Sequence, residues 1–140
     1  TAAYAENATF TTLNLDKAQM QGGHFSRADL RDCSLRSADL RGSYFDDADM
    51  ARVDLTDAKL SGLRLDSEGD SKRVQPTDLS NADLRYAVLR GADLRYCILT
   101  GVNLCYADLI GADLRDADLA GTNLKGARLD EIRQNDGTNW

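Results

Sequence analysis

Apart from its carboxylates, this chain has few side chains that could do chemistry. Its 140 residues include one histidine, His24, and three cysteines, Cys33, Cys97 and Cys105. An imidazole can act as a general base or a metal ligand at neutral pH, and a thiolate can act as a nucleophile. Because no cysteine lies beside His24 and no second histidine exists, we expect a surface residue, with acid–base or metal chemistry as the alternative.

The carboxylates are numerous, with 23 Asp and Glu against 17 Lys and Arg and a net charge of −6. Paired carboxylates could serve general acid–base catalysis. The negative balance argues against direct nucleic-acid binding through a basic patch. No apolar run approaches the ~20 residues of a membrane span, and no glycine-rich loop for phosphates is present. We therefore expect no membrane span and no cofactor.

A five-residue repeat explains where most of these residues stand. A large apolar residue recurs at every fifth position from Phe10 to Leu65 and again from Leu79 to Leu129. These 23 positions hold 18 Leu, three Phe and two Met, and the position two residues earlier is Ala in 13 cases. Since the repeat accounts for most carboxylates and singles out none of them, we expect no enzyme. The sequence Ala-Asp-Leu-Arg occurs at 28–31, 38–41, 82–85, 92–95 and 112–115.

A period of five fits neither a helix nor a continuous strand. On a helix these leucines would spread around the cylinder, and on a strand they would alternate between faces. A short extended segment followed by a turn keeps them all inside, and such segments stack in parallel about 4.8 Å apart. Gly22, Gly42 and Gly62 recur at 20 residues, which favours four segments per coil.

These segments resemble the Ala-Asp/Asn-Leu-X-X consensus of the pentapeptide-repeat family over about residues 8–131, with one interruption. The resemblance implies an all-β solenoid, a right-handed quadrilateral parallel β-helix with four pentapeptides per coil and nearly six coils. From the terminal residues we expect short helical caps. Leucine then fills the axis, and the small residue lets the wall close around it. The expected core includes Leu30, Leu35, Leu40, Leu84, Leu89, Leu94, Leu99 and Leu104.

We expect a single domain over 1–140. Residues 1–7 are predicted as an N-terminal cap with Tyr4 as its lid, followed by a first repeat block at 8–65. An exposed loop insertion at 66–76 separates it from a second block at 77–129. Residues 130–140 are predicted as a capping helix and tail, with Asp130 as N-cap, Gly137 as stop and Ile132 covering the last coil.

The loop insertion breaks the phase of the repeat and contains the chain's single proline. It has almost no apolar content, so we expect it to leave one corner of the solenoid. Two interpretations stay open, a partner-binding loop and a tolerated corner insertion. The candidate interaction residues are Asp66, Glu68, Asp70, Lys72, Arg73 and Pro76.

The outward positions also carry a prediction. Asp and Arg of each Ala-Asp-Leu-Arg segment should both face outward, with Arg95 near Asp113 on the next coil. Such pairs contribute only about 0–1 kcal/mol each, and they form either a solvated face or a charged docking strip. Tyr86 and Tyr106 should stack on one face, as a docking patch or as corner packing, with Tyr96 on the opposite face.

The cysteines divide by their place in the repeat. Cys33 and Cys97 occupy the small inward position, where a thiol behaves as a compact apolar group. Cys105 should face outward and is the more reactive candidate. A Cys97–Cys105 disulfide is not expected, because one inward side chain would have to turn outward.

The size, the expected capped ends and the internal loop resemble the pentapeptide-repeat proteins of the plant thylakoid lumen, with cyanobacterial relatives as competitors. The resemblance implies a mature lumenal chain without its transit peptide. We expect a non-enzymatic, monomeric interaction scaffold with an unknown protein partner. The alternative is a DNA-mimicking regulator of a topoisomerase, against which the evenly spread Arg residues argue.

Overall fold

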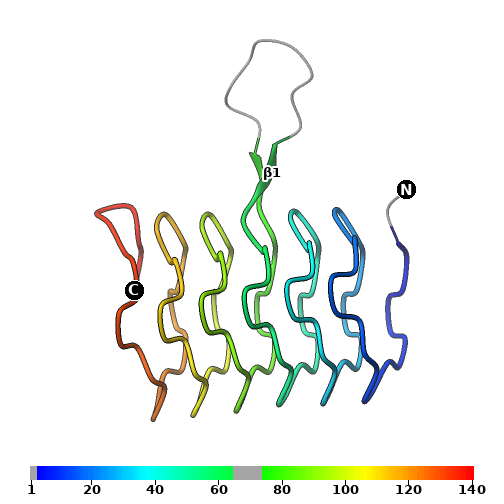
Figure 1. Cartoon of the computed structure of the whole chain (residues 1–140). Helices are drawn as coiled ribbons and strands as arrows, with labels where there is room; N and C mark the ends of the chain where they lie inside the picture. The colour runs from blue at the N-terminus through cyan, green and yellow to red at the C-terminus, as the bar shows by residue number, and fades with distance from the viewer. Residues whose placement is uncertain (1–2, 65–73) are drawn as a thin grey trace.

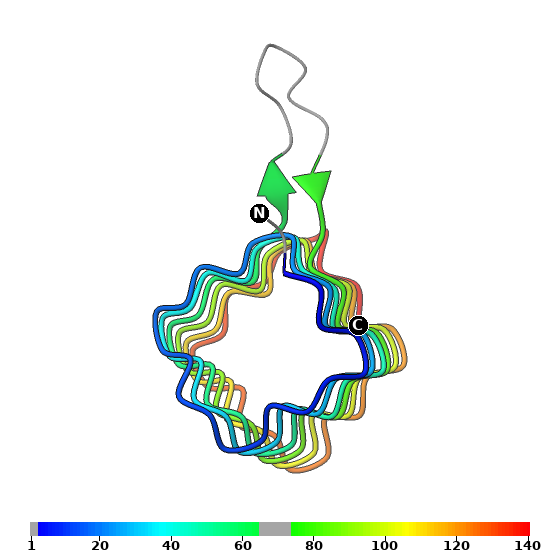
Figure 2. The same ribbon diagram turned by 90° about the vertical axis from the view of Figure 1, so that its right-hand side faces the viewer.

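The computed structural model describes residues 3–64 and 74–140, which form a right-handed parallel β-helix of square outline (Figure 2). Single parallel bridges join equivalent residues 20 apart in the sequence, such as Asp29 with Asp49 and Asp93 with Asp113. Across the insertion the spacing is 34, as between Tyr44 and Asp78. The prediction of four pentapeptides per coil in a quadrilateral β-helix is confirmed.

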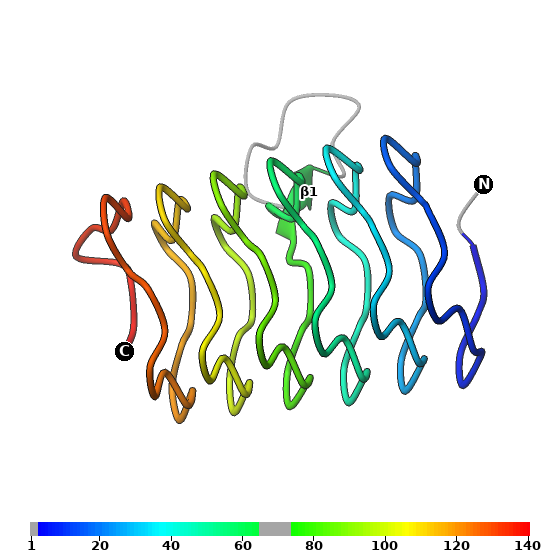
Figure 3. The ribbon, with the colours of Figure 1, turned by 60° about the horizontal axis from the view of Figure 1, so that its bottom comes forward.

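Four faces run along the rod, and we number each by the outward residue that its segments present. The coils follow one another along the axis (Figure 3), and six of them are complete among the described residues. Face 1 consists of Tyr4, His24, Tyr44, Asp78, Ile98, Asp118 and Asn139, and face 2 of Thr9, Asp29, Asp49, Asp83, Asn103 and Asn123. Face 3 consists of Asn14, Ser34, Asp54, Val88, Asp108 and Arg128, and face 4 of Gln19, Asp39, Lys59, Asp93, Asp113 and Arg133.

The corners between faces are tight turns closed by backbone hydrogen bonds. The amide of Ala28, for example, donates to the carbonyl of Phe25 at 2.9 Å. The residue just before the donor adopts a positive φ, which is 68° at Gly101 and 60° at Tyr106. Glycine accepts this left-handed region freely, whereas a tyrosine is strained there.

The interior is a column of large apolar side chains enclosed by small ones. All eight leucines expected in the core are at most 1% exposed. Phe25 and Phe45 stack inside the column with ring centroids 5.1 Å apart. Burying each leucine contributes roughly 1.5–3 kcal/mol, so stability is distributed along the rod.

The small inward position also has a polar use that the sequence pattern did not predict. Where it holds a hydroxyl or a thiol, that group donates to a carbonyl of the preceding coil, which satisfies a buried polar group. The donors and acceptors are Ser43 to Met20 (2.8 Å), Thr77 to Leu40 (3.2 Å), Thr122 to Leu99 (2.7 Å), Thr138 to Leu114 (3.0 Å), Cys33 to Phe10 (2.8 Å) and Cys97 to Leu60 (3.0 Å).

Both terminal segments continue the coil, and the prediction of helical caps is wrong for the described residues. At the C-terminus, Ile132 takes the small inward position and Arg133 bridges to Asp113. At the N-terminus, Tyr4 bridges to His24 and is 78% exposed on face 1, so it is no lid over the core. A neighbouring coil offers backbone hydrogen-bond partners to these segments, and that pairing outweighs their local helix signals.

The insertion begins as a two-stranded hairpin that leaves the corner between faces 4 and 1 near the middle of the rod (Figure 1). Strand β1, Leu63–Arg64, pairs antiparallel with strand β2, Val74–Gln75. Residues 63–64 thus pair within the hairpin. Residue 65, the predicted end of the first repeat block, lies outside the described residues. Gly62 is required at the base of the hairpin, because a Cβ atom would approach Val74 Cγ1 to 2.1 Å.

Of the candidate loop residues, Pro76 lies at the base of the hairpin and is half-buried. The others, Asp66, Glu68, Asp70, Lys72 and Arg73, lie outside the described residues. The side chain of Gln75 donates to the carbonyl of Gly42 in the preceding coil. The described residues contain no helix long and apolar enough to cross a membrane.

Candidate functional site

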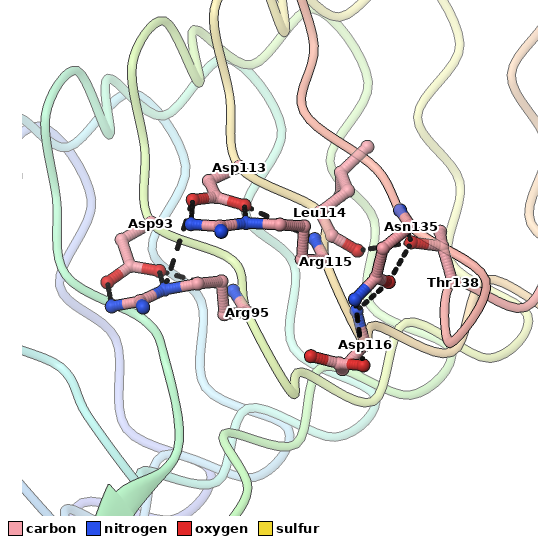
Figure 4. A network of polar contacts seen from close by, with 8 residues as sticks. All are labelled: Asp93, Arg95, Asp113, Leu114, Arg115, Asp116, Asn135 and Thr138. Carbon is pink, nitrogen blue, oxygen red and sulfur yellow. Dashed lines mark hydrogen bonds and ion pairs between the residues drawn. The ribbon is translucent and has the colours of Figure 1, made fainter.

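Face 4 carries a ladder of ion pairs built from single pentapeptides. Because the residues before and after leucine both point outward, the Asp and Arg of one Ala-Asp-Leu-Arg segment meet side by side. In Arg115, Nε and Nη2 donate to the two carboxylate oxygens of Asp113 at 2.9 and 2.7 Å. Arg95 holds Asp93 in the same way at 2.8 and 2.9 Å (Figure 4).

The expected pair between coils is present but secondary. Arg95 Nε lies 3.9 Å from Asp113 Oδ2, well beyond its distance to Asp93. The repeat pattern predicted that Asp and Arg face outward, but it did not predict that they pair within one segment. The spacing of two residues around an inward leucine was the signal that could have shown it.

Two of the carboxylates on face 4 are buried. Asp39 is 5% exposed and Asp113 is 9% exposed. Hydrogen bonds from Arg41 and Arg115 hold the pKa of these two carboxyls below their ordinary value. Burial raises the pKa of Asp93, but hydrogen bonds from Arg95 and Ser61 outweigh it and leave the pKa lowered. All three therefore stay ionised at neutral pH.

A groove of about 420 Å³ lies along this part of face 4. Two glycines on the adjoining corner, Gly91 and Gly111, have φ of 64° and 71° and contribute no side chain. The wall therefore stays open above the charged residues. The groove is lined by Gly91, Asp93, Arg95, Gly111, Asp113, Arg115 and Arg133.

Face 1 carries a second ladder, which is aromatic. His24 lies between Tyr4 and Tyr44, with ring centroids 4.8 Å away on each side. His24 points outward as predicted, and it is half-buried because the two tyrosine rings cover its faces. This stack was not predicted, although the three residues stand 20 apart in the sequence. No group of His, Cys, Asp and Glu suited to a metal ion occurs among the described residues.

The corner tyrosines lie as expected. Tyr86 and Tyr106 stack with centroids 5.3 Å apart and an interplanar angle of 9°. Tyr96 follows face 4, whereas the stacked pair follows face 2, so the two sets lie on opposite sides of the rod. All three are about half exposed.

All three thiols are free. Those of Cys33 and Cys97 are buried in the small inward position, and burial raises the pKa of both. Cys105 is half-buried and lies on the outer side of its segment. Because a thiol with a raised pKa is a poor nucleophile, Cys33 and Cys97 are unsuited to that role. Cys105 is the accessible candidate of the three.

Comparison with known proteins identifies the repeat itself. The family description "Pentapeptide repeats" matches in eight copies, over residues 1–32, 33–67, 77–105 and 97–133. No curated protein matches the chain.

Several solved structures are similar. One is a pentapeptide repeat protein from the cyanobacterium Cyanothece 51142, with 24% identity, 99% of this chain and 88% of that chain covered, and a TM-score of 0.45. Another, from Nostoc PCC 7120, has 33% identity, coverage of 84% and 73%, and a TM-score of 0.43. A third, from the Arabidopsis thaliana thylakoid lumen, has 27% identity, coverage of 89% and 70%, and a TM-score of 0.38. With the repeat matched over most of its length, the chain belongs to the pentapeptide-repeat family.

Proposed function

We propose that this protein is a non-enzymatic scaffold that binds a partner protein through face 4 and the neighbouring hairpin. The observation that carries the proposal is the position of one ladder of bidentate Asp–Arg pairs, that of face 4, beside the hairpin, whereas the similar pairs on face 2 lie on the opposite side of the rod. Each guanidinium is held by two hydrogen bonds, as in Arg115 with Asp113. A surface whose charged groups are already ordered loses less conformational entropy when a partner binds.

The same pairing makes these carboxylates unsuited to proton transfer. A general acid or base works best with a pKa near the operating pH. The carboxyls of Asp39, Asp93 and Asp113 have their pKa lowered instead. Their charges therefore suit recognition better than catalysis.

The position of the hairpin supports a composite contact. Strands β1 and β2 leave the rod at the edge of face 4, and Gly62 at their base donates its amide to the carbonyl of Arg95 at 3.2 Å. Gln75 ties the other side of the hairpin to Gly42. A partner that touches the hairpin would therefore lie beside the ion-pair ladder.

The test is capture of partners from native extract by cross-linking and mass spectrometry. One variant replaces residues 65–73 with Asn-Gly, a turn that joins two antiparallel strands directly. A second carries Arg95→Glu and Arg115→Glu on face 4. The matched control carries Arg31→Glu and Arg85→Glu on the opposite face 2, where Asp29 and Asp83 hold the same kind of pair.

We expect the partners captured by the wild type to be lost from the first two variants and kept by the control. Recovery of the same partners without residues 65–73 would refute the role of the hairpin. Equal loss from the face 2 control would show that the contact is not confined to face 4.

We also propose that the protein works in the thylakoid lumen, because the layout of its sequence resembles that of the pentapeptide-repeat proteins of the plant thylakoid lumen. Fractionation of the native tissue should place it in the lumen. Detection in the stroma or the cytosol would end this proposal.

The DNA-mimic alternative finds less support on the surface. A mimic of DNA needs columns of negative charge, whereas an arginine accompanies each aspartate at Asp29, Asp39, Asp83, Asp93 and Asp113. The discriminating measurement is DNA supercoiling by a topoisomerase with the protein in large excess. Inhibition there would favour the alternative over the scaffold.

A further inference from the structure

The ladder on face 4 breaks at its last rung. Arg95 has the carboxylate of its own segment and, 3.9 Å away, that of Asp113 on the following coil. If the same arrangement continued one coil further, Arg115 would lie near the residue that follows Asp113 on face 4. That residue is Arg133, which bridges to Asp113, so a second cation stands where the repeat has an anion.

Arg133 is exposed and makes no ion pair among the described residues. Asn135 follows Arg133 by two residues, the position that Arg115 has relative to Asp113, but its side chain contacts Asp116 instead of residue 133. Its Nδ2 donates to Asp116 Oδ1 at 3.1 Å, and its Oδ1 accepts from the Asp116 amide at 3.0 Å (Figure 4).

The groove beside this rung is open to a ligand. Arg95, Arg115 and Arg133 line it together with Asp93 and Asp113. Each of the two carboxylates is matched by the arginine of its own segment. The lining of the groove therefore contains three arginines and two carboxylates, and Arg133 is the arginine without an ion pair among the described residues.

Lys59 on the same face shows that a cation alone does not make such a site. It too stands where other rungs have Asp, but its bridges join it to Asp39 on one side and Asp93 on the other. Arg133 has a carboxylate rung only on the Asp113 side. Lys59 is also absent from the lining of the groove.

We propose that Arg115 and Arg133 together bind the carboxylate of an Asp or Glu side chain of the partner protein. This rests on the proposed scaffold function and names the chemistry of its partner. A carboxylate is favoured because every other arginine on the face is matched by one, in the bidentate geometry that guanidinium and carboxylate share. The partner's acidic side chain thus supplies the anion missing from the last rung.

The experiment follows the Nε–Hε NMR signals of Arg115 and Arg133 in the intact protein at constant ionic strength. The probes are acetyl-Ala-Asp-Ala-amide, its Asn counterpart and inorganic phosphate. We expect a saturable shift of both signals with the Asp peptide and none with the Asn peptide. R133Q should weaken binding by about tenfold, as expected when one of two charge-assisted partners is lost. K59Q, the matched control, should bind as the wild type does.

R133D gives an independent readout, because it supplies the missing carboxylate from within the chain. It should abolish peptide binding and raise the urea midpoint, since Arg115 then gains a second carboxylate. Equal shifts with the Asp and Asn peptides, or undiminished binding by R133Q, would overturn the proposal. A shift with phosphate but not with the Asp peptide would overturn the carboxylate assignment. Failure of these peptide titrations while face 4 variants still lose partners would leave the scaffold standing without this site.

Discussion

The central and terminal coils are built from the same pentapeptide but differ in what covers their leucines. Leu84 and Leu89, with coils on both sides, are at most 1% exposed. Leu124 and Leu129 near the C-terminus, like Phe10 near the N-terminus, are only partly buried. Burial in this fold therefore comes from neighbouring coils and not from the segment itself, as in other solenoids.

Truncating a central leucine should have the largest effect. Leu84→Ala should lower the free energy of unfolding by about 2–5 kcal/mol, because both adjacent coils lose contacts and a cavity remains. Leu124→Ala should cost less than half as much, since one side of that leucine is already open. Urea denaturation of both variants measures the difference. Equal losses would show that the terminal coil is as well covered as the centre.

The reactivity of the thiols should also report the difference in burial between the central and terminal coils, a gradient that falls toward the ends of the rod. Cys105 should react with a thiol reagent in the native protein, because it is half-buried on the outer side. Cys33 donates to Phe10 in the first coil and should react more slowly, through local opening of that end. Cys97 should react last, with unfolding of the central coils. Mass spectrometry of a labelling time course gives the order, and labelling of Cys97 before Cys33 would contradict the gradient.

The buried carboxylates should make the protein sensitive to acid. Asp113 has a lowered pKa in the folded state, so its contribution is complete above the unfolded value of about 3.9 and is lost as pH falls below it. Asp113→Asn should cost about 1 kcal/mol at pH 7, because Arg115 loses its charged acceptor. It should also flatten the loss of stability below about pH 4.

Asp16 in the first coil is an exposed carboxylate to compare with the buried Asp113, and it accepts a hydrogen bond from the Arg36 amide at 3.0 Å. Its pKa is also lowered, chiefly by a hydrogen bond from Ser34. Asp16→Asn should cost less than Asp113→Asn, because solvent reaches this carboxyl. Urea denaturation at several pH values tests both, and an unchanged acid profile in Asp113→Asn would argue against its pairing with Arg115.

The smallest effect concerns the strained corners. Tyr106 has a φ of 60°, which glycine adopts at no steric cost. Tyr106→Gly should therefore be more stable than Tyr106→Ala by about 1 kcal/mol. Both variants lose the stack on Tyr86, so their difference isolates the backbone strain. Thermal unfolding of the two variants measures the difference in their stability. An alanine variant as stable as the glycine variant would mean that the corner can relax.

Much of the fold was predictable because the repeat is so regular. The leucine column, the inward Cys33 and Cys97 and the stack of Tyr86 on Tyr106 all follow from position in the repeat. The helical cap predicted from Asp130 and Gly137 was wrong, because those signals are local and a neighbouring coil offered stronger pairing. The site was less predictable. Arg133 looks like any surface arginine until its bridge to Asp113 places it in the ladder.

The order of the residues is enough to predict the period of five, the inward leucine and the outward Asp and Arg, since these depend only on how an extended segment alternates its side chains. Which residues meet across coils depends on how the coils stack. The bridged residues are 20 apart along most of the chain, 34 apart across the insertion and 21 apart at the last bridge, Asp118 with Asn139. The aromatic ladder on face 1 and the unmatched cation at Arg133 exist because stacking aligns residues that the chain keeps far apart.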